Sequence, residues 1–186
     1  MKGRRPPSLA ATAVRVGDAL RRGGIRGVLT GGACASLYTG GRYQSADVDI
    51  IPQSAVPRRD LDAAMESIGF SRRRDRYVHA TLPFYVEFPR GPLAIGADHR
   101  IRPVERGHGR ARALVLSPTD SCRDRLAAFY HWDDRQSLEV AIVIARRNRV
   151  NMAAISRWSR GEGAVDRFRE FSTQLKKTGS RGTRQP

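Results

Sequence analysis

The sequence predicts a mixed α/β fold with a helical bundle at its C-terminal end. The run IRGVLT at 25–30 is rich in β-formers, ends in Gly31-Gly32 and is followed by a helical pattern, which is the order strand, turn, helix. The segment ADVDII at 46–51 alternates polar and apolar residues as a half-buried strand does. From Pro118 onward apolar residues recur at helical spacing. We therefore expect an α/β core over residues 1–117, a helical region over 118–172 and a basic, disordered tail over 173–186.

The other elements of the core follow from the same patterns. Apolar residues recur every three or four positions over 8–22 and over 58–69, and each stretch ends at glycine, so we expect two helices there. Glycines 40 and 41 are expected to end the helix that follows Gly32. Extended segments are predicted at 70–80, 83–88, 92–96 and 113–117, with a basic turn over 102–112.

The helical region has recognisable start signals. Ser117 is a candidate N-cap, Pro118 suits the first helical position and Asp120 falls in the first turn. Asp133 and Asp134 follow this helix and either could cap the next one. We expect three or four helices after residue 117.

Composition limits the partners and the location. The chain has 34 Lys+Arg against 18 Asp+Glu, a formal net charge of +16. This charge favours polyanionic partners such as RNA, although a drift of the coding sequence toward arginine would raise it too. Cys34 and Cys122 are isolated and are expected to be buried thiols. The longest apolar run, at 140–145, is far shorter than the roughly 20 residues that span a bilayer, so we expect no membrane segment and a cytoplasmic protein.

Carboxylates on strands are the residues that suggest chemistry. Asp47 and Asp49 share one face of the expected strand, where their charges repel unless a cation lies between them. Mg²⁺ takes such oxygen ligands and completes its shell with water and substrate phosphates. Glu87 in YVEF offers a third carboxylate, with Glu105 and Asp98 as alternatives. Thr30, Gly31 and Gly32 lie between strand and helix, where free backbone N–H groups can bind phosphate.

The segment VLTGGACASLYTGGRYQSADVDII, with YVEF further on, resembles the nucleotidyltransferase superfamily related to DNA polymerase β. The pattern in that family is a hydrophobic residue, Gly, then Gly or Ser, a spacer of about a dozen residues, and Asp-x-Asp or Asp-x-Glu. The spacer here is slightly long, and in this it is similar to small bacterial members, including the nucleotidyltransferase-like toxins of abortive-infection systems. The resemblance covers residues 25–90 well, and it implies a polymerase-β-like α/β core.

The resemblance also implies roles for individual residues. It implies that Asp47, Asp49 and Glu87 bind two catalytic Mg²⁺ ions, with Mn²⁺ as a substitute, and that Glu87 can act as a general base. Many members have Ser at the position of Gly32, so backbone N–H groups or Ser45 would replace that hydroxyl. Family members often place a Lys near a helix start to contact phosphate, and Arg123, ahead of Arg125, takes that place here. The expected phosphate-binding set is Thr30, Gly31, Gly32, Ser45, Arg123 and Arg42, the last of which is alternatively a solvated turn residue.

The activity implied by the resemblance is transfer of a nucleoside monophosphate from a triphosphate such as ATP to a hydroxyl. The basic charge favours RNA, particularly tRNA, as the acceptor, which would suit a toxin-like enzyme with an antitoxin partner. Two alternatives stay open. One is a protein or small-molecule acceptor of the aminoglycoside type, and the other is a module that kept the fold and binds nucleic acid without catalysis.

Overall fold

The computed structural model describes residues 7–43 and 45–177. These residues fall into two compact units. One comprises residues up to 93 together with 102–117, and the other comprises 94–101 together with residues from 118 onward. Each unit has its own secondary structure and its own core, so we describe them separately.

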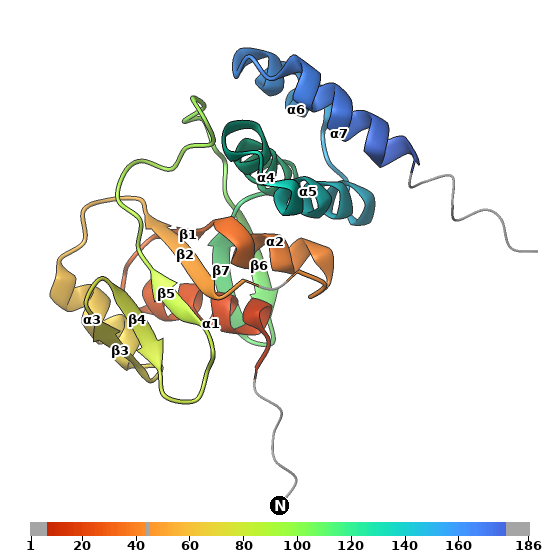
Figure 1. Ribbon diagram of the computed structural model, residues 1–186. Coiled ribbons are helices and arrows are strands. Elements are labelled where there is room, and N and C mark those ends of the chain that lie inside the picture. The colour runs from red at the N-terminus through yellow and green to blue at the C-terminus, as the bar shows by residue number, and fades with distance from the viewer. Residues whose placement is uncertain (1–6, 44, 178–186) are drawn as a thin grey trace, which may run out of the picture. The chain divides into compact units, whose positions relative to one another are not determined.

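The first unit is built on a seven-stranded mixed sheet of order β3-β4-β5-β2-β1-β7-β6 (Figure 1). Its central strand β2 is antiparallel to β1 and parallel to β5, and β1 is parallel to β7. The strands are β1 (Gly27–Leu29), β2 (Asp47–Pro52), β3 (Phe70–Arg73), β4 (Arg76–His79), β5 (Tyr85–Glu87), β6 (Val104–His108) and β7 (Ala111–Val115). The helices are α1 (Leu9–Arg22), α2 (Gly31–Thr39) and α3 (Arg58–Glu66).

Helices α1 and α3 cover one face of this sheet. Val48 and Ile50 point to that face and are fully buried, and both Ile50 and Leu20 of α1 lie against Gly27. On the same face the Tyr77 hydroxyl donates to the Asp62 carboxylate of α3 at 2.8 Å. The alternation along β2 therefore sends its apolar side chains under the helices and its two carboxylates to the other face.

The helical unit contains α4 (Pro118–Trp132), α5 (Arg135–Arg147), α6 (Met152–Gly161) and α7 (Val165–Lys177). Asp134 caps α5, and its carboxylate accepts from the backbone N–H of Ser137 at 3.1 Å. The core of this unit is fully buried and includes Leu126, Phe129, Leu138, Ile144, Ile155 and Phe171. In the part of the chain that the structure describes, no helix is both long and apolar enough to cross a bilayer.

The mixed α/β fold with C-terminal helices is confirmed, and most predicted elements are found close to their expected bounds. Cys34 and Cys122 are both buried thiols, as expected. Gly40 ends α2 in the left-handed conformation, with φ of 66°.

Four local expectations were wrong. Residues 70–80 are not one extended segment but a hairpin, because the chain turns at Arg74, whose φ is +59°. Residues 92–96 contain only a single bridge, between Ile95 and Asp98, and the Ile95 carbonyl accepts from both the Asp98 N–H and the Trp158 indole of α6. The basic segment 102–112 contains the edge strand β6, whose charged residues face solvent.

The fourth difference concerns the expected tail. Helix α7 continues through residues 173–177, because Phe171 anchors it in the core and Lys176 and Lys177 suit the negative end of a helix. The Leu175 carbonyl also accepts from Arg146 of α5 at 3.1 Å. The remainder of that expected segment, 178–186, lies outside the described residues.

Candidate functional site

The turn between β1 and α2 and the strand β2 form the centre of the candidate site. Gly31 has a φ of +64°, and a Cβ placed on it would lie 2.5 Å from Asp49 Oδ2. The Asp49 carboxylate therefore lies directly against the first residue of α2. The backbone joins the same two segments, since the Thr30 N–H donates to the Asp49 carbonyl at 2.9 Å.

The segment before β2 packs against the second glycine of the turn. A Cβ on Gly32 would lie 2.8 Å from both Cβ and Oγ of Ser45 and 3.0 Å from the Tyr43 ring. The Ser45 hydroxyl in turn donates to the Asp47 carboxylate. A serine at position 32 would not fit this arrangement, and the Ser45 hydroxyl is the one that stands next to the turn.

Glu87 joins the site through the register of the sheet. Strand β5 runs parallel to β2, with Asp47 opposite Tyr85 and Asp49 opposite Glu87. Residues directly opposite each other point to the same face, so the three carboxylates share the face that α1 and α3 leave uncovered. All three side chains belong to half-buried residues.

The charges on this face affect the pKa of the Tyr85 hydroxyl. Burial raises the pKa of Tyr85, and the negative charges of Asp47, Glu87 and Asp49 raise it further, while Arg76 opposes them. The Arg76 guanidinium lies 4.8 Å from the centre of the Tyr85 ring. The face thus carries three carboxylates, a phenol and a guanidinium within electrostatic reach of each other.

The two alternatives to Glu87 are placed elsewhere. Glu105 is exposed on the edge strand β6, at the far side of β1 and β7 from β2. Asp98 belongs to the helical unit, where it pairs with Arg123 and Arg100. Among the expected carboxylates, Glu87 is the one that adjoins Asp49.

Arg42 and Arg123 are the remaining expected phosphate ligands. Arg42 is exposed in the turn before β2 and forms no hydrogen bond or ion pair with the residues that the structure describes. Arg123 lies in the helical unit, where its side chain is 8% exposed and pairs with Asp98 at 2.6 Å and Asp120 at 2.9 Å. Its guanidinium also lies 5.0 Å from the Trp158 ring. These contacts give Arg123 a structural role within its own unit.

The carboxylates offer the oxygen ligands that Mg²⁺ prefers. Over residues 7–43 and 45–177, however, no three His, Cys, Asp or Glu side chains are already gathered as a metal site. Asp47 and Asp49 are two positions apart on β2, and Asp49 is directly opposite Glu87 in the register.

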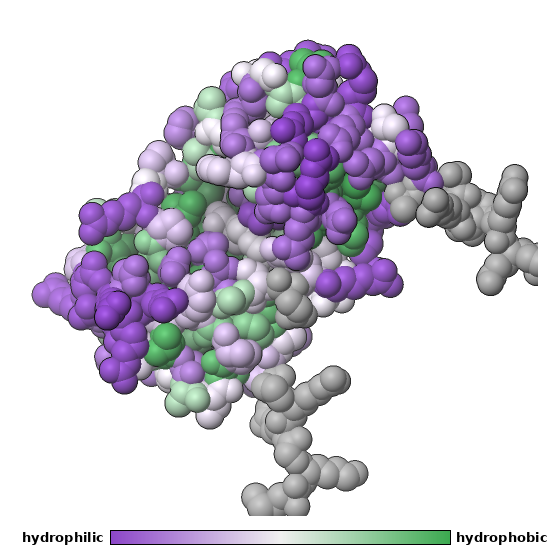
Figure 2. Space-filling view, in the orientation of Figure 1, coloured by the Kyte–Doolittle hydropathy of each residue, from purple (hydrophilic) through white to green (hydrophobic). Residues whose placement is uncertain are grey.

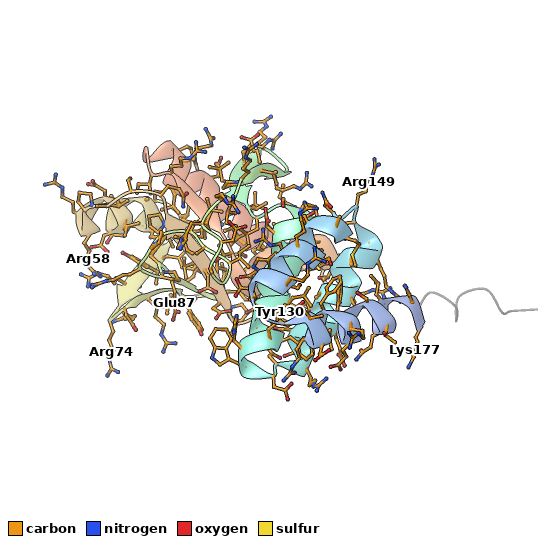
Figure 3. All side chains as sticks on the ribbon, turned by 90° about the horizontal axis from the view of Figure 1, so that it is seen from above. Arg58, Arg74, Glu87, Tyr130, Arg149 and Lys177 are labelled. Carbon is orange, nitrogen blue, oxygen red and sulfur yellow. The ribbon has the colours of Figure 1, made fainter. Side chains whose placement is uncertain are left out.

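Two arginines on this face were not expected from the sequence. Arg76 of β4 and Arg73 of β3 pair with each other in the hairpin, next to β5. Figure 3 shows the neighbouring Arg74 extending outward at this edge of the unit, with Glu87 on the same unit. The sequence RRRDRYVH predicts that Arg73 and Arg76 share one face only if a turn is placed at Arg74-Asp75, because that turn sets which residues of the two strands lie opposite each other.

The candidate site therefore consists of a glycine turn beside paired strand carboxylates in a seven-stranded mixed sheet. The chain is similar over 91% of its length to the crystal structure of an antigenic nucleotidyltransferase-like protein from Paracoccidioides brasiliensis, of which it covers 92%, with a TM-score of 0.57 and 13% sequence identity. No family model and no curated protein matches the sequence. The likeness shows that the chain has a fold like that of this nucleotidyltransferase-like protein.

Proposed function

We propose that this chain is a metal-dependent nucleotidyltransferase that transfers a nucleoside monophosphate from a triphosphate such as ATP to a hydroxyl group. The observation that carries the proposal is the approach of Gly31 to the Asp49 carboxylate. It puts a turn with free backbone N–H groups and a strand carboxylate at one place, as a metal-bound triphosphate requires. The nucleotidyltransferase-like fold supports the proposal.

Asp47, Asp49 and Glu87 are the residues that would hold Mg²⁺ or Mn²⁺. Their donor chemistry fits, because all three are carboxylates on one half-buried face. When bound, two such ions neutralise charge on the phosphates and make the acceptor hydroxyl more acidic.

The chain's own groups bind and orient the reactants. The backbone N–H groups at Gly31 and Gly32 bind the triphosphate, and the Ser45 hydroxyl orients the Asp47 carboxylate. The acceptor oxygen forms a bond to the α-phosphorus while the bond from that phosphorus to the bridging oxygen breaks, and pyrophosphate leaves. Glu87 accepts the proton of the acceptor hydroxyl.

RNA is the acceptor that we propose, since a net charge of +16 favours a polyanion. If the enzyme acts as a toxin on tRNA, its expression arrests growth and Asp49→Asn relieves the arrest. Growth that continues on expression of the wild type would contradict the toxin hypothesis, without bearing on catalysis.

The direct test is transfer of label. The purified protein is incubated with Mg²⁺, each α-³²P-labelled triphosphate in turn and total cellular RNA, beside Asp47→Asn/Asp49→Asn. We expect label on RNA with the wild type and a loss of more than about 100-fold in the variant, because the metal sites supply several kcal/mol of transition-state stabilisation. Glu105→Gln, which removes an exposed carboxylate from the same sheet, is the matched control and should retain transfer.

Binding of the triphosphate separates the other outcomes. Mg²⁺-dependent nucleotide binding that is lost in the aspartate variant, without label on RNA, would support catalysis with a protein or small-molecule acceptor. A wild-type protein that binds no nucleotide would contradict the proposal and favour the non-catalytic module.

A further inference from the structure

Four charged residues form a row across the sheet on the open face. Asp49 of β2 stands opposite Glu87 of β5. Since Tyr77 pairs with Val86 in the antiparallel register of β4 and β5, Arg76 stands opposite Glu87 on its other side. Arg76 in turn pairs with Arg73 of β3. The row therefore runs carboxylate, carboxylate, guanidinium, guanidinium, and its members share one face.

The arginine end of this row opens onto a surface cavity of about 700 Å³. Its lining consists of Arg72, Arg73, Arg74, Asp75, Arg76 and Glu87. All four arginines are exposed, and in Figure 2 hydrophilic residues gather over the part of the unit formed by α3, β3 and β4. We call residues 72–76 the arginine hairpin.

Two of these guanidinium groups are available to a ligand. Arg72 forms an ion pair with Asp62 of α3 at 3.1 Å, and the guanidinium of Arg76 lies over the Tyr85 ring. Arg73 and Arg74 form no hydrogen bond or ion pair with any residue that the structure describes. An arginine presents a planar fork of N–H donors that binds phosphate in a bidentate manner, so free arginines at a cavity favour a phosphate-bearing ligand.

The strand order separates this ligand from the proposed triphosphate. The glycine turn follows β1, on one side of β2, whereas β5, β4 and β3 lie on the other side. The carboxylates thus stand between the glycine turn and the arginine hairpin. Arg73 is two strands beyond Glu87, a separation of about 10 Å at the usual strand spacing. A phosphate bound there would lie on the opposite side of the carboxylates from the glycine turn.

We propose that the arginine hairpin binds the phosphate backbone of a single-stranded RNA end and so delivers its terminal hydroxyl to Glu87. This inference rests on the nucleotidyl transfer proposed above, and it names the surface that receives the acceptor. Successive phosphates of one strand match successive guanidinium groups, whereas a small cationic acceptor would be repelled by this edge.

The test measures RNA binding without nucleotide or divalent metal. A single-stranded RNA oligonucleotide with a 5′-fluorescein label is titrated with the protein, and anisotropy is followed at several salt concentrations. Arg73→Ala/Arg74→Ala is compared with Arg58→Ala/Arg59→Ala, which removes the same charge from the start of α3, the helix that covers the opposite face. Both pairs are exposed, so each variant should fold.

The hairpin variant should bind RNA at least about tenfold more weakly, and the slope of log K against log salt should become shallower by about 1.4, that is about 0.7 for each lost phosphate contact on a single strand. The control variant should bind like the wild type. Equal weakening in both variants would overturn the proposal, because the effect would then be diffuse attraction by net charge. No weakening in the hairpin variant would also overturn it.

Nucleotide binding distinguishes this proposal from the one on which it rests. The hairpin variant should bind Mg²⁺ and triphosphate as the wild type does, and loss of that binding would assign the arginines to the nucleotide and overturn the inference. If Asp47→Asn/Asp49→Asn instead binds triphosphate unchanged, the proposed nucleotide site fails, while the comparison of RNA binding between hairpin and control is unaffected.

Discussion

At the scale of single residues, Gly31 meets two demands at once. Its φ of +64° is a conformation that side chains disfavour, and the space where a Cβ would go is taken by the Asp49 carboxylate. Gly41 has a similar φ of +74°, but a Cβ there would meet nothing within 4 Å. Comparing alanine substitutions at the two glycines therefore separates the stability lost to backbone strain from the stability lost to crowding Asp49.

We expect Gly41→Ala to lower the free energy of unfolding by about 1 kcal/mol, from backbone strain alone. Gly31→Ala should cost about 2–3 kcal/mol, because Asp49 must also move away from the new methyl group. Urea unfolding followed by far-UV circular dichroism measures both. Nucleotide binding should weaken in Gly31→Ala only, and equal effects of the two substitutions on both readouts would contradict the argument.

Asp18 is a second residue whose charge contributes to the stability of the fold. A hydrogen bond from Arg21 lowers the pKa of Asp18, and the backbone N–H of Arg112 and the charge of Arg22 act in the same direction, although burial opposes them. Because the pKa in the folded protein lies below the ordinary value of 3.8, the ionised carboxylate stabilises the fold above that pH. This stabilisation is lost as the pH falls through the folded pKa.

Asp18→Asn should therefore lower the free energy of unfolding by about 1–2 kcal/mol at neutral pH. The difference from the wild type should shrink as the pH falls below 3.8 and through the lowered pKa of the folded protein, because the wild-type carboxyl then becomes protonated in both states. Chemical unfolding at a series of pH values checks this. A difference that stays constant down to the lowest pH would show that the charge of Asp18 is not the cause.

At the scale of secondary-structure elements, the sequence predicted the helix ends and strand faces that depend on a few adjacent residues. Asp134 caps α5 and Gly40 ends α2, and both signals are present in a few adjacent residues. The face shared by Asp47 and Asp49 follows from alternation within one strand. The register of the sheet places Glu87 opposite Asp49, on a strand with the same alternation of polar and apolar residues.

The residues around positions 74 and 75 do not predict the hairpin of β3 and β4. Its turn has no glycine, and Arg74 adopts the left-handed conformation in its place. A strand pairing between distant segments sets the register, so the row from Asp49 to Arg73 depends on three strand pairings that no single segment encodes. The arginines could be recognised as charged, but not as members of the site.

The segment 94–101 is held to the helical unit by side chains. Arg123 of α4 donates to the Asp98 carboxylate at 2.6 Å, and hydrogen bonds from Arg100 and Arg123 lower the pKa of Asp98. Arg123 also pairs with Asp120 on its own helix, and its side chain is nearly buried. Removing its charge would take an ion pair from each of two partly buried carboxylates, Asp98 and Asp120.

Arg123→Met should lower the stability of the helical unit by about 3 kcal/mol. Urea unfolding followed by tryptophan fluorescence measures this. Arg125→Met is a control on the same helix, since Arg125 pairs with its neighbour Asp124, and it should cost less. If Arg123→Met retained full stability and lost only nucleotide binding, Arg123 would be a phosphate ligand as the resemblance implied.

At the scale of the whole molecule, the chain crosses between its units three times, after residues 93, 101 and 117. Each unit nevertheless buries its own apolar core, with Leu29, Ile50 and Met65 in one and Phe129, Ile155 and Phe171 in the other. The boundary at 117 coincides with the change from strand to helix patterns. The inclusion of 94–101 with the helices depends on the tertiary contacts of Asp98 and Trp158, which the sequence did not reveal.

The two tryptophans of the chain, Trp132 and Trp158, both lie in the helical unit, so their fluorescence reports on that unit while far-UV circular dichroism reports on both. Because the two cores are separate, we expect Gly31→Ala to lower the urea midpoint of part of the dichroism signal and to leave the fluorescence midpoint unchanged. Arg123→Met should shift the fluorescence midpoint and leave the remaining dichroism transition in place. Fluorescence and dichroism midpoints that coincide in both variants would show that the two units unfold as one cooperative structure. In that case Arg123→Met, in the helical unit, would lower the stability of the unit that contains the glycine turn as well.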